Sequence, residues 1–288
     1  MNKIEISKLK NSLKKISELA ENYEENHLNY YKTLENLKPY WISKKGDIFF
    51  EKTYQEQKNQ KNIIKNLEEI KKIYDYIENK YKKIGDKVYF SFKNIDKLSN
   101  IIEVCINRLT KIINLYNNLN FENFTNEQIN ILIEEQKIIT KNLESIQQIK
   151  EELNNKLELL EEIENKIELK ISNIIINVNI HQDNAINIEK NTNEIIVQIE
   201  ELEKAIKLIN MYKNEESILI EEIKKYYKDI NYFYKTSNTT TLDKIKGYII
   251  KEMNNIVEIH NNNKTDLELE QAATKELEIK VSKILSEE

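Results

Sequence analysis

Apolar residues recur every three or four positions along most of the chain, which is the spacing of long amphipathic helices. One such series occupies ten positions of the first segment: Ile6, Leu9, Leu13, Ile16, Ala20, Tyr23, His27, Tyr30, Leu34 and Leu37. A second series runs from Phe49 to Ile84 and ends before Gly85 and Asp86. Two such series joined by a short break predict a helical hairpin over residues 1–90, with its tip at 39–46.

The break between these two series contains residues that are rare elsewhere in the chain. Pro39 is the only proline, Trp41 is the only tryptophan, and Gly46 is one of three glycines. Because a proline disfavours the α conformation of the residue before it, the first helix is expected to end at Lys38. We expect Gly46 to supply a positive φ and Asp47 to act as the N-cap of the second helix.

The spacing continues after residue 90 with two further turn signals. A third apolar series ends in NNLNFENFTNEQ (117–128), in which Thr125 and Gln128 have the spacing of a capping box. From 129 to 209 the series is free of Gly and Pro, which favours one long, bent helix over two helices broken near 177–184. SNTTT (237–241) predicts a turn before the final helix, and NNNKTD (261–266) is expected to loosen or break that helix.

Composition supports an all-α fold of long antiparallel helical hairpins or an elongated coiled-coil bundle. Three Gly, one Pro and 32% charged residues are typical of long helices and unlike a strand-rich domain. The expected organisation is a helical hairpin at 1–90, long coiled-coil helices at 91–235, and a C-terminal helix at 236–288 that packs back on the bundle. Polar residues in the long series, at 178–192, are interpreted as a layer that fixes the helix register.

Charge and hydropathy exclude several classes of function. The net charge of -5 is mixed in sign, with no basic stripe for nucleic acid. No window approaches 18 uninterrupted apolar residues, so no transmembrane segment is expected. Residues 1–20 lack the apolar core of a signal peptide, which favours either the cytoplasm or export without a cleavable leader.

Catalytic and metal-binding patterns are also missing from the sequence. His27, His181 and His260 are far apart and lack the paired spacing that metal sites use. His27 and His181 fall on apolar series and are expected to be polar residues of the core, and Cys105 is expected to be a buried structural thiol. We therefore expect no enzymatic activity, no cofactor and no metal.

The tip resembles the WXG-type (ESAT-like) helical hairpins over residues 1 to about 90. In that family the tip carries Trp-x-Gly or Trp-x-Ser, and Trp41-Ile42-Ser43 stands in that place, with Ser43 where the first form has Gly. The family's export signal in the second helix is Tyr-x-x-x-Asp/Glu, which Tyr74 and Glu78 match. The expected site residues are therefore Pro39, Trp41, Ser43 and Gly46 at the tip, and Tyr74 and Glu78 in the second helix.

The resemblance implies a non-enzymatic binding protein that is a secreted substrate or helper of a type VII (ESX-like) secretion system. Its expected partners are another helical protein or a second copy, bound through the apolar seams, and a secretion ATPase. The alternative is an intracellular coiled-coil scaffold or tether in the cytoplasm, in which the series at 129–209 is the functional element. A helical pore-forming toxin component is a third reading, but the sequence contains no hydrophobic insertion hairpin.

Overall fold

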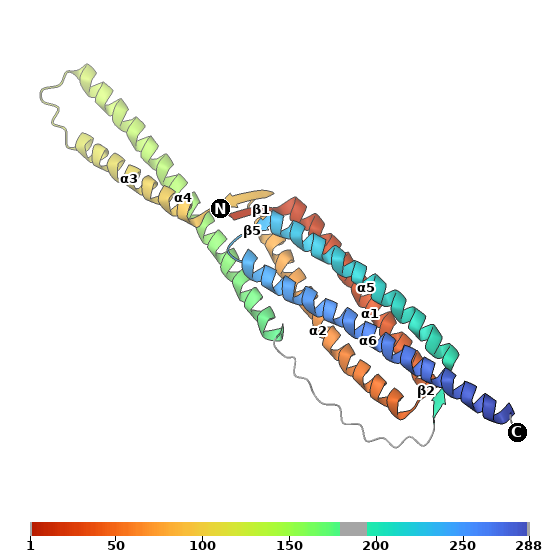
Figure 1. Ribbon diagram of the computed structural model, residues 1–288. Coiled ribbons are helices and arrows are strands. Elements are labelled where there is room, and N and C mark those ends of the chain that lie inside the picture. Colours follow the sequence, from red (N-terminus) through yellow and green to blue (C-terminus); the bar gives the residue numbers. More distant parts are fainter. Residues whose placement is uncertain (1, 179–194, 287–288) are drawn as a thin grey trace. The chain divides into compact units, whose positions relative to one another are not determined.

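The computed structural model describes residues 2–178 and 195–286, and its described part is dominated by long helices (Figure 1). The helices are α1 (Ile6–Leu37), the 3₁₀ helix η1 (Lys38–Tyr40), α2 (Lys44–Tyr81), α3 (Phe92–Asn117), α4 (Asn126–Val178), α5 (Ile199–Phe233) and α6 (Thr239–Ser286). The strands are short: β1 (Asn2–Glu5), β2 (Trp41–Ile42), β3 (Lys87–Phe90), β4 (Ile196–Val197) and β5 (Tyr234–Lys235). The predicted all-α class is confirmed.

The chain forms two compact units. One contains Met1–Lys3 and Lys87–Lys166, and the other contains Ile4–Asp86 and Ile167–Glu288. Helix α4 contributes to both units, so the segment 91–235, which the sequence presents as one stretch, is shared between them.

The larger unit contains a four-helix bundle made of α1, α2, α5 and α6. Helix α1 packs against α2 and α5, and α6 packs against the same two helices, so each helix has two neighbours in the ring (Figure 1). Neighbouring helices run antiparallel, which is the arrangement of an up-and-down bundle.

Apolar positions of the predicted series form the interior of the bundle. Leu9, Tyr23 and Tyr30 of α1 are fully buried, as are Ile77 and Tyr81 of α2. The other helices contribute Ile223 and Ile230 of α5 and Leu242, Met253 and Leu267 of α6. Because burial of one large apolar side chain contributes about 1.5–3 kcal/mol, these layers are the main stabilising element of the unit.

Polar caps fix the ends of the helices. The main-chain N–H of Ser7 donates to Oδ1 of Asp86 at 3.0 Å, so the acidic side chain of a distant residue caps α1, whose own N-cap residue makes no such bond. At the start of α4, Thr125 N donates to Gln128 Oε1 at 2.9 Å and Gln128 N donates to Thr125 Oγ1 at 3.3 Å. The predicted capping box is therefore confirmed.

The smaller unit contains a two-helix hairpin of α3 and the 126–166 part of α4, called here the α3–α4 hairpin. Tyr116 donates from its hydroxyl to Glu135 at 2.8 Å, and Gln136 donates from its amide to Asn117 at 2.6 Å. Lys150 and Glu103 form an ion pair further along the two helices. These three contacts fix which residues of the two helices lie side by side.

The predicted single helix over 129–209 is wrong. Helix α4 ends at Val178, whereas β4 at Ile196–Val197 is extended and α5 begins at Ile199. Strand β4 pairs antiparallel with β2, with Trp41 opposite Val197. This pairing places the start of α5 beside the end of α1, so a tertiary contact outweighs the local helical spacing. The predicted break point at 177–184 and the polar layer at 178–192 lie largely outside the described residues.

The predicted interruption of the last helix at 261–266 is also wrong, because α6 continues from Thr239 to Ser286. Asn263 lies in this stretch and is completely buried. Its amide donates to Tyr30 at 3.0 Å and to Glu56 at 2.8 Å, so the polar side chain is accommodated inside the bundle without breaking the helix.

Candidate functional site

The turn between α1 and α2 is closed by the packing of Trp41 on Gly46. Trp41 is 3% exposed, and a Cβ added to Gly46 would lie 2.6 Å from the main-chain oxygen of Trp41. Gly46 is helical, so the predicted positive φ is wrong, and the position requires glycine because of this close approach. Ser43 is the N-cap, accepting from Gly46 N at 3.0 Å, and this corrects the prediction for Asp47, which lies in the first turn of α2.

The tip is part of the bundle's own core. Pro39 lies in η1, directly after α1 ends at Leu37, as the sequence predicts within one residue. The ring of Trp41 lies 5.0 Å from that of Phe49. The surrounding core also contains Leu202 and Ile209 of α5 and Leu267 of α6: Trp41 therefore packs against helices of the same chain.

A small pocket lies beside this tip, between α2 and α6. Its volume is about 290 Å³, and it is lined by Trp41, Lys45, Ile48, Phe49, Lys52, Asp266, Leu269 and Glu270. Two ion pairs connect the helices at its edge: Lys45 with Glu270 at 3.4 Å and Lys52 with Asp266 at 3.8 Å. The lining charges balance, so the pocket has no marked preference for an anion or a cation.

The two residues of the predicted export signal have different environments. Tyr74 is 1% exposed, and burial raises the pKa of its hydroxyl well above the ordinary value. Glu78 is half-buried at the bundle surface and pairs with Lys10 of α1 at 3.3 Å. A helix places residues four apart on one face, but only the carboxylate of this pair reaches the surface of the bundle.

A cluster of buried polar side chains crosses the middle of the bundle, and all four helices contribute to it. We call it the central polar cluster. Its members are Tyr23, His27, Tyr30 and Tyr31 of α1, Glu56 and Gln60 of α2, Glu216 of α5, and His260 and Asn263 of α6. Each member is at most 8% exposed.

Glu216 and His260 form the centre of the cluster. Nδ1 of His260 lies 2.8 Å from Oε2 of Glu216, and Nε2 of the same ring lies 2.9 Å from the amide nitrogen of Gln60. Because an amide nitrogen only donates, Nε2 of His260 must accept and Nδ1 carries the proton that faces the carboxylate. The ring of Tyr30 stacks on the imidazole with centroids 3.6 Å apart.

His27 is one of the cluster members whose polar atoms lack hydrogen-bond partners in the described structure. It is 4% exposed, and neither ring nitrogen has a hydrogen-bond partner among the described residues. Its Nδ1 lies 3.9 Å from Glu216, too far for a hydrogen bond. Burial, and secondarily the nearby His260, hold the pKa of His27 well below its usual value, so the ring is neutral at neutral pH.

The sequence predicted His27 as a polar core residue, which is confirmed, but did not predict its meeting with His260. Their ring centroids lie 5.6 Å apart although the residues are distant in the chain. The spacing in α6 does indicate that His260 lies on the core face. His260 follows Ile256 of the apolar series by four residues, and Asn263 follows His260 by three. His181 lies outside the described residues.

The cluster has the residue types of an acid–base site, but its side chains are buried among the described residues. The small pocket between α2 and α6 is lined by other residues. Among residues 2–178 and 195–286, no group of three His, Cys, Asp or Glu side chains is arranged to hold a metal ion. The arrangement is suited to fixing which helices pair and in which register.

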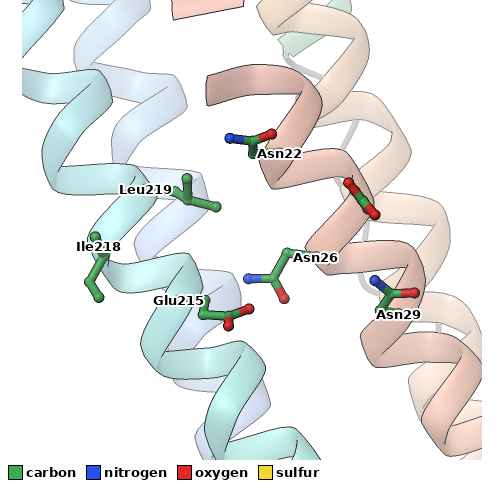
Figure 2. Close-up of a pocket in the computed structure, with 7 residues that line it drawn as sticks. Asn22, Asn26, Asn29, Glu215, Ile218 and Leu219 are labelled. Carbon is green, nitrogen blue, oxygen red and sulfur yellow. The ribbon is translucent and has the colours of Figure 1, made fainter. Parts of the chain in front are cut away.

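A polar groove lies on the surface between α1 and α5. Its volume is about 350 Å³, and its lining is Asn22, Glu25, Asn26, Asn29, Glu215, Ile218 and Leu219. Figure 2 shows the side chains of Asn26 and Glu215 extending into the space between the two helices. Asn26 is itself engaged, since its amide donates to the main-chain oxygen of Tyr212 at 3.0 Å.

The α3–α4 hairpin leaves more large apolar side chains exposed than it buries. On α3 only Ile102 is buried, and the residues that face α4, Ile106, Leu109 and Ile113, are half-buried. Ile133 and Leu159 of α4 are exposed on other sides of that helix. The exposed residues on one side of the hairpin are Leu98, Ile101, Val104, Ile112 and Leu115 of α3 and Ile131, Ile138 and Ile149 of α4, with exposed fractions between 38% and 68%. We call these eight residues the open face.

Cys105 is exposed on α3, which corrects the prediction of a buried thiol. The apolar series of α3 is compatible with two neighbouring faces that share Ile102 and Leu109. The face that packs against α4 continues through Ile106 and Ile113, and the alternative face through Cys105 and Ile112 is left to solvent.

Comparisons with models of protein families, with curated proteins and with solved structures find no match to this chain. The described helices include none that combines the length and apolarity needed to cross a membrane.

Proposed function

We propose that the protein is a non-enzymatic helical binding protein and that the open face of the α3–α4 hairpin is its binding surface. The observation that carries the proposal is the exposure of eight large apolar residues on two neighbouring helices, for example Leu115 at 68% and Ile138 at 60%. Contiguous exposed apolar surface on a soluble protein typically marks an interaction site.

The two units differ in how completely they bury their apolar residues, and this difference supports the proposal. The apolar seams of α1 and α2, which the sequence suggested for a partner, are covered by α5 and α6 of the same chain. The bundle therefore does not need a partner hairpin to bury them. The hairpin is left with half-buried facing residues and an uncovered face, which a helical partner would complete.

Export by a type VII route is a second candidate. The packing of Trp41 against the Ser43-capped start of α2 favours it, because Trp and Ser stand at the turn between two antiparallel helices as in the WXG-type hairpins. Buried Tyr74 implies that its recognition by a secretion ATPase would require at least local opening of the bundle, whereas Glu78 is accessible without it. The cytoplasmic scaffold remains the alternative, with the α3–α4 hairpin in place of a continuous helix over 129–209.

Site-specific photo-crosslinking in the native host tests the binding function. A photoreactive phenylalanine analogue at Leu115, on the open face, is expected to give covalent adducts with a discrete protein. The same analogue at Leu28, which is 55% exposed on α1, is the matched control. Equal adduct yields at the two positions, or none at Leu115, would rule out the open face as the binding surface.

Secretion of the same tagged chain tests the export candidate separately. Glu78→Gln removes the charge of the predicted signal at a partly exposed position, and Glu35→Gln is the control in a second Tyr-x-x-x-Glu match (31–35) on α1. If the export candidate is correct, wild type and Glu35→Gln appear in the medium and Glu78→Gln stays in the cells. Retention of all three in the cells would leave only the cytoplasmic alternative.

A further inference from the structure

The open face lies on one side of the α3–α4 hairpin. On each helix the residues of the open face lie on average about 100° around the axis from those that face the other helix, in the same rotational sense when viewed from the N-terminus. Because α3 and α4 run antiparallel, equal displacements of the same sense point to the same side of the hairpin. The two helices thus present one apolar layer.

Contacts between the helices show which residues of this layer are level with one another. The bond between Gln136 and Asn117 and the ion pair of Lys150 with Glu103 join residues whose numbers rise on one helix as they fall on the other. This register places Leu115 beside Ile138. The ion pair of Glu103 with Lys150, further along, places Val104 beside Ile149.

Charge differs between the two helices of the hairpin. Helix α3 carries more basic than acidic residues: Lys93, Lys97, Arg108 and Lys111 against Asp96 and Glu103. In the 126–166 part of α4, acidic residues outnumber basic ones by ten to five. An α3 helix laid on another α3 would bring like charge together, whereas α3 laid on α4 would bring opposite charge together.

The size of the layer matches that of a stable interface. Helix α3 has 26 residues, which corresponds to a length of roughly 39 Å. Two helices side by side are roughly 20 Å wide. The layer therefore covers roughly 800 Å², which is the area per partner of a standard protein–protein interface.

We propose that the partner on the open face is a second copy of this chain, packed so that α3 of each hairpin lies on α4 of the other. The proposal rests on the binding function assigned to this face. A twofold axis parallel to the helices produces this arrangement, and the result is a four-helix bundle in which all neighbours are antiparallel. Leu115 of one copy then lies over Ile138 of the other, and the two hairpin tips lie at the same end.

Sedimentation equilibrium of the purified full chain tests the association. Wild type is expected at twice 34.4 kDa. Leu115→Lys and Ile138→Lys are each expected to weaken dimerisation at least tenfold, and Leu28→Lys to leave it unchanged. Circular dichroism checks that each variant remains helical. A monomeric wild type, or equal weakening by all three substitutions, overturns the proposal.

The outcome is distinguishable from failure of the binding function itself. If crosslinking at Leu115 captures a different protein while the purified chain is monomeric, the self-association proposal is wrong and the binding function stands. If neither adducts nor dimers form, both are wrong.

The packing direction has its own test. A single spin label at Glu122→Cys, in a Cys105→Ser background, reports the distance between the two hairpin tips. The proposed arrangement requires a distance near the width of a four-helix bundle, roughly 20 Å. A distance as long as α3 or longer, roughly 39 Å, would instead place the tips at opposite ends and contradict the packing of α3 on α4.

Discussion

Nδ1 of His260 lies 2.8 Å from Oε2 of Glu216 in the interior of the four-helix bundle, joining α6 to α5. Glu216 is 3% exposed, and the only other imidazole near it, His27 of α1, is neutral and beyond hydrogen-bond distance within the described part of the chain. His260 thus lies closer to this carboxylate than His27 does. Since a buried charge without compensation is costly, the contact favours the one helix register in which it forms.

Glu216→Gln is expected to lower the free energy of unfolding by about 1–3 kcal/mol. The substitution keeps the shape of the side chain but replaces the carboxylate, which lies 2.8 Å from Nδ1 of His260, with a neutral amide that is a weaker partner for the buried polar atoms around it. Glu215→Gln changes the adjacent exposed carboxylate and is expected to stay within about 0.5 kcal/mol of wild type. Urea unfolding followed by circular dichroism measures the free energy of unfolding of both variants. Equal losses would show that the buried carboxylate of Glu216 contributes no more to stability than the exposed one of Glu215.

His27 should make the stability of the protein depend on pH below neutrality. Its pKa in the folded state is lowered by burial, so below about pH 6.5 the unfolded chain binds a proton that the folded chain does not. Stability contributed by the neutral ring is therefore present above the unfolded pKa and is lost as the pH falls, by up to about 1.4 kcal/mol per pH unit.

Two variants isolate this effect from that of Glu56, whose pKa is raised mainly by burial. Glu56 acts in the opposite sense, since its contribution is present at low pH and is lost as the pH rises through its folded-state pKa. The stability difference between wild type and His27→Phe should shrink on acidification, whereas the difference between wild type and Glu56→Gln should grow. Parallel stability curves for wild type and His27→Phe between pH 7 and 5 would contradict the assignment.

The sequence predicts which residues of each helix face the interior, but it does not predict which residues of different helices meet there. The apolar spacing places His27, Glu56 and Gln60 on core faces of α1 and α2, and the structure buries all three. It does not reveal that these positions lie at the same height in the bundle as Glu216 and His260. That height depends on where each helix begins, which is set by the turn at 38–43, by the pairing of β2 with β4, and by the cap from Asp86 to Ser7.

Gly46→Ala should destabilise the turn between α1 and α2. The added Cβ would lie 2.6 Å from the main-chain oxygen of Trp41, and a contact this close with backbone forces the strand or the start of α2 to shift. We expect a loss of about 1–3 kcal/mol in the free energy of unfolding. Because Trp41 is the only tryptophan, its fluorescence should also shift to the red as the ring becomes more exposed.

Gly247→Ala is the matched control for this substitution. Gly247 lies within α6, and a Cβ added there meets nothing within 4 Å. Alanine is favoured over glycine inside a helix by about 1 kcal/mol, so this variant should be more stable than wild type. The same sign of change in both variants would mean that helix propensity, and not the contact with Trp41, decides the effect at Gly46.

The tip illustrates what spacing and composition reveal and what they miss. Proline and tryptophan correctly marked the end of α1, because their local effects do not depend on the rest of the fold. The role of Gly46 was predicted incorrectly, because the close approach of Trp41 to α2 is a tertiary contact. Likewise the apolar series of α3 allowed two packing faces, and only the position of α4 decides that Ile106 faces inward and Cys105 outward.

Asp86→Ala should lower the stability of the bundle by about 1 kcal/mol. The carboxylate accepts from the main-chain N–H of Ser7 at 3.0 Å, so it satisfies a free donor at the start of α1 and places a negative charge at the positive end of the helix dipole. The main-chain bond from Ile6 N to Asp86 O, 2.8 Å, does not require the side chain and is retained in this variant.

Asp86→Asn is the control, because it keeps an acceptor but removes the charge. Its loss of stability should be about half as large and insensitive to salt. Thermal unfolding at low and high salt distinguishes the hydrogen bond from the charge effect. If the alanine and asparagine variants are equally destabilised at low salt, the charge alone accounts for the cap. If both variants match wild type, Asp86 does not cap α1 in solution.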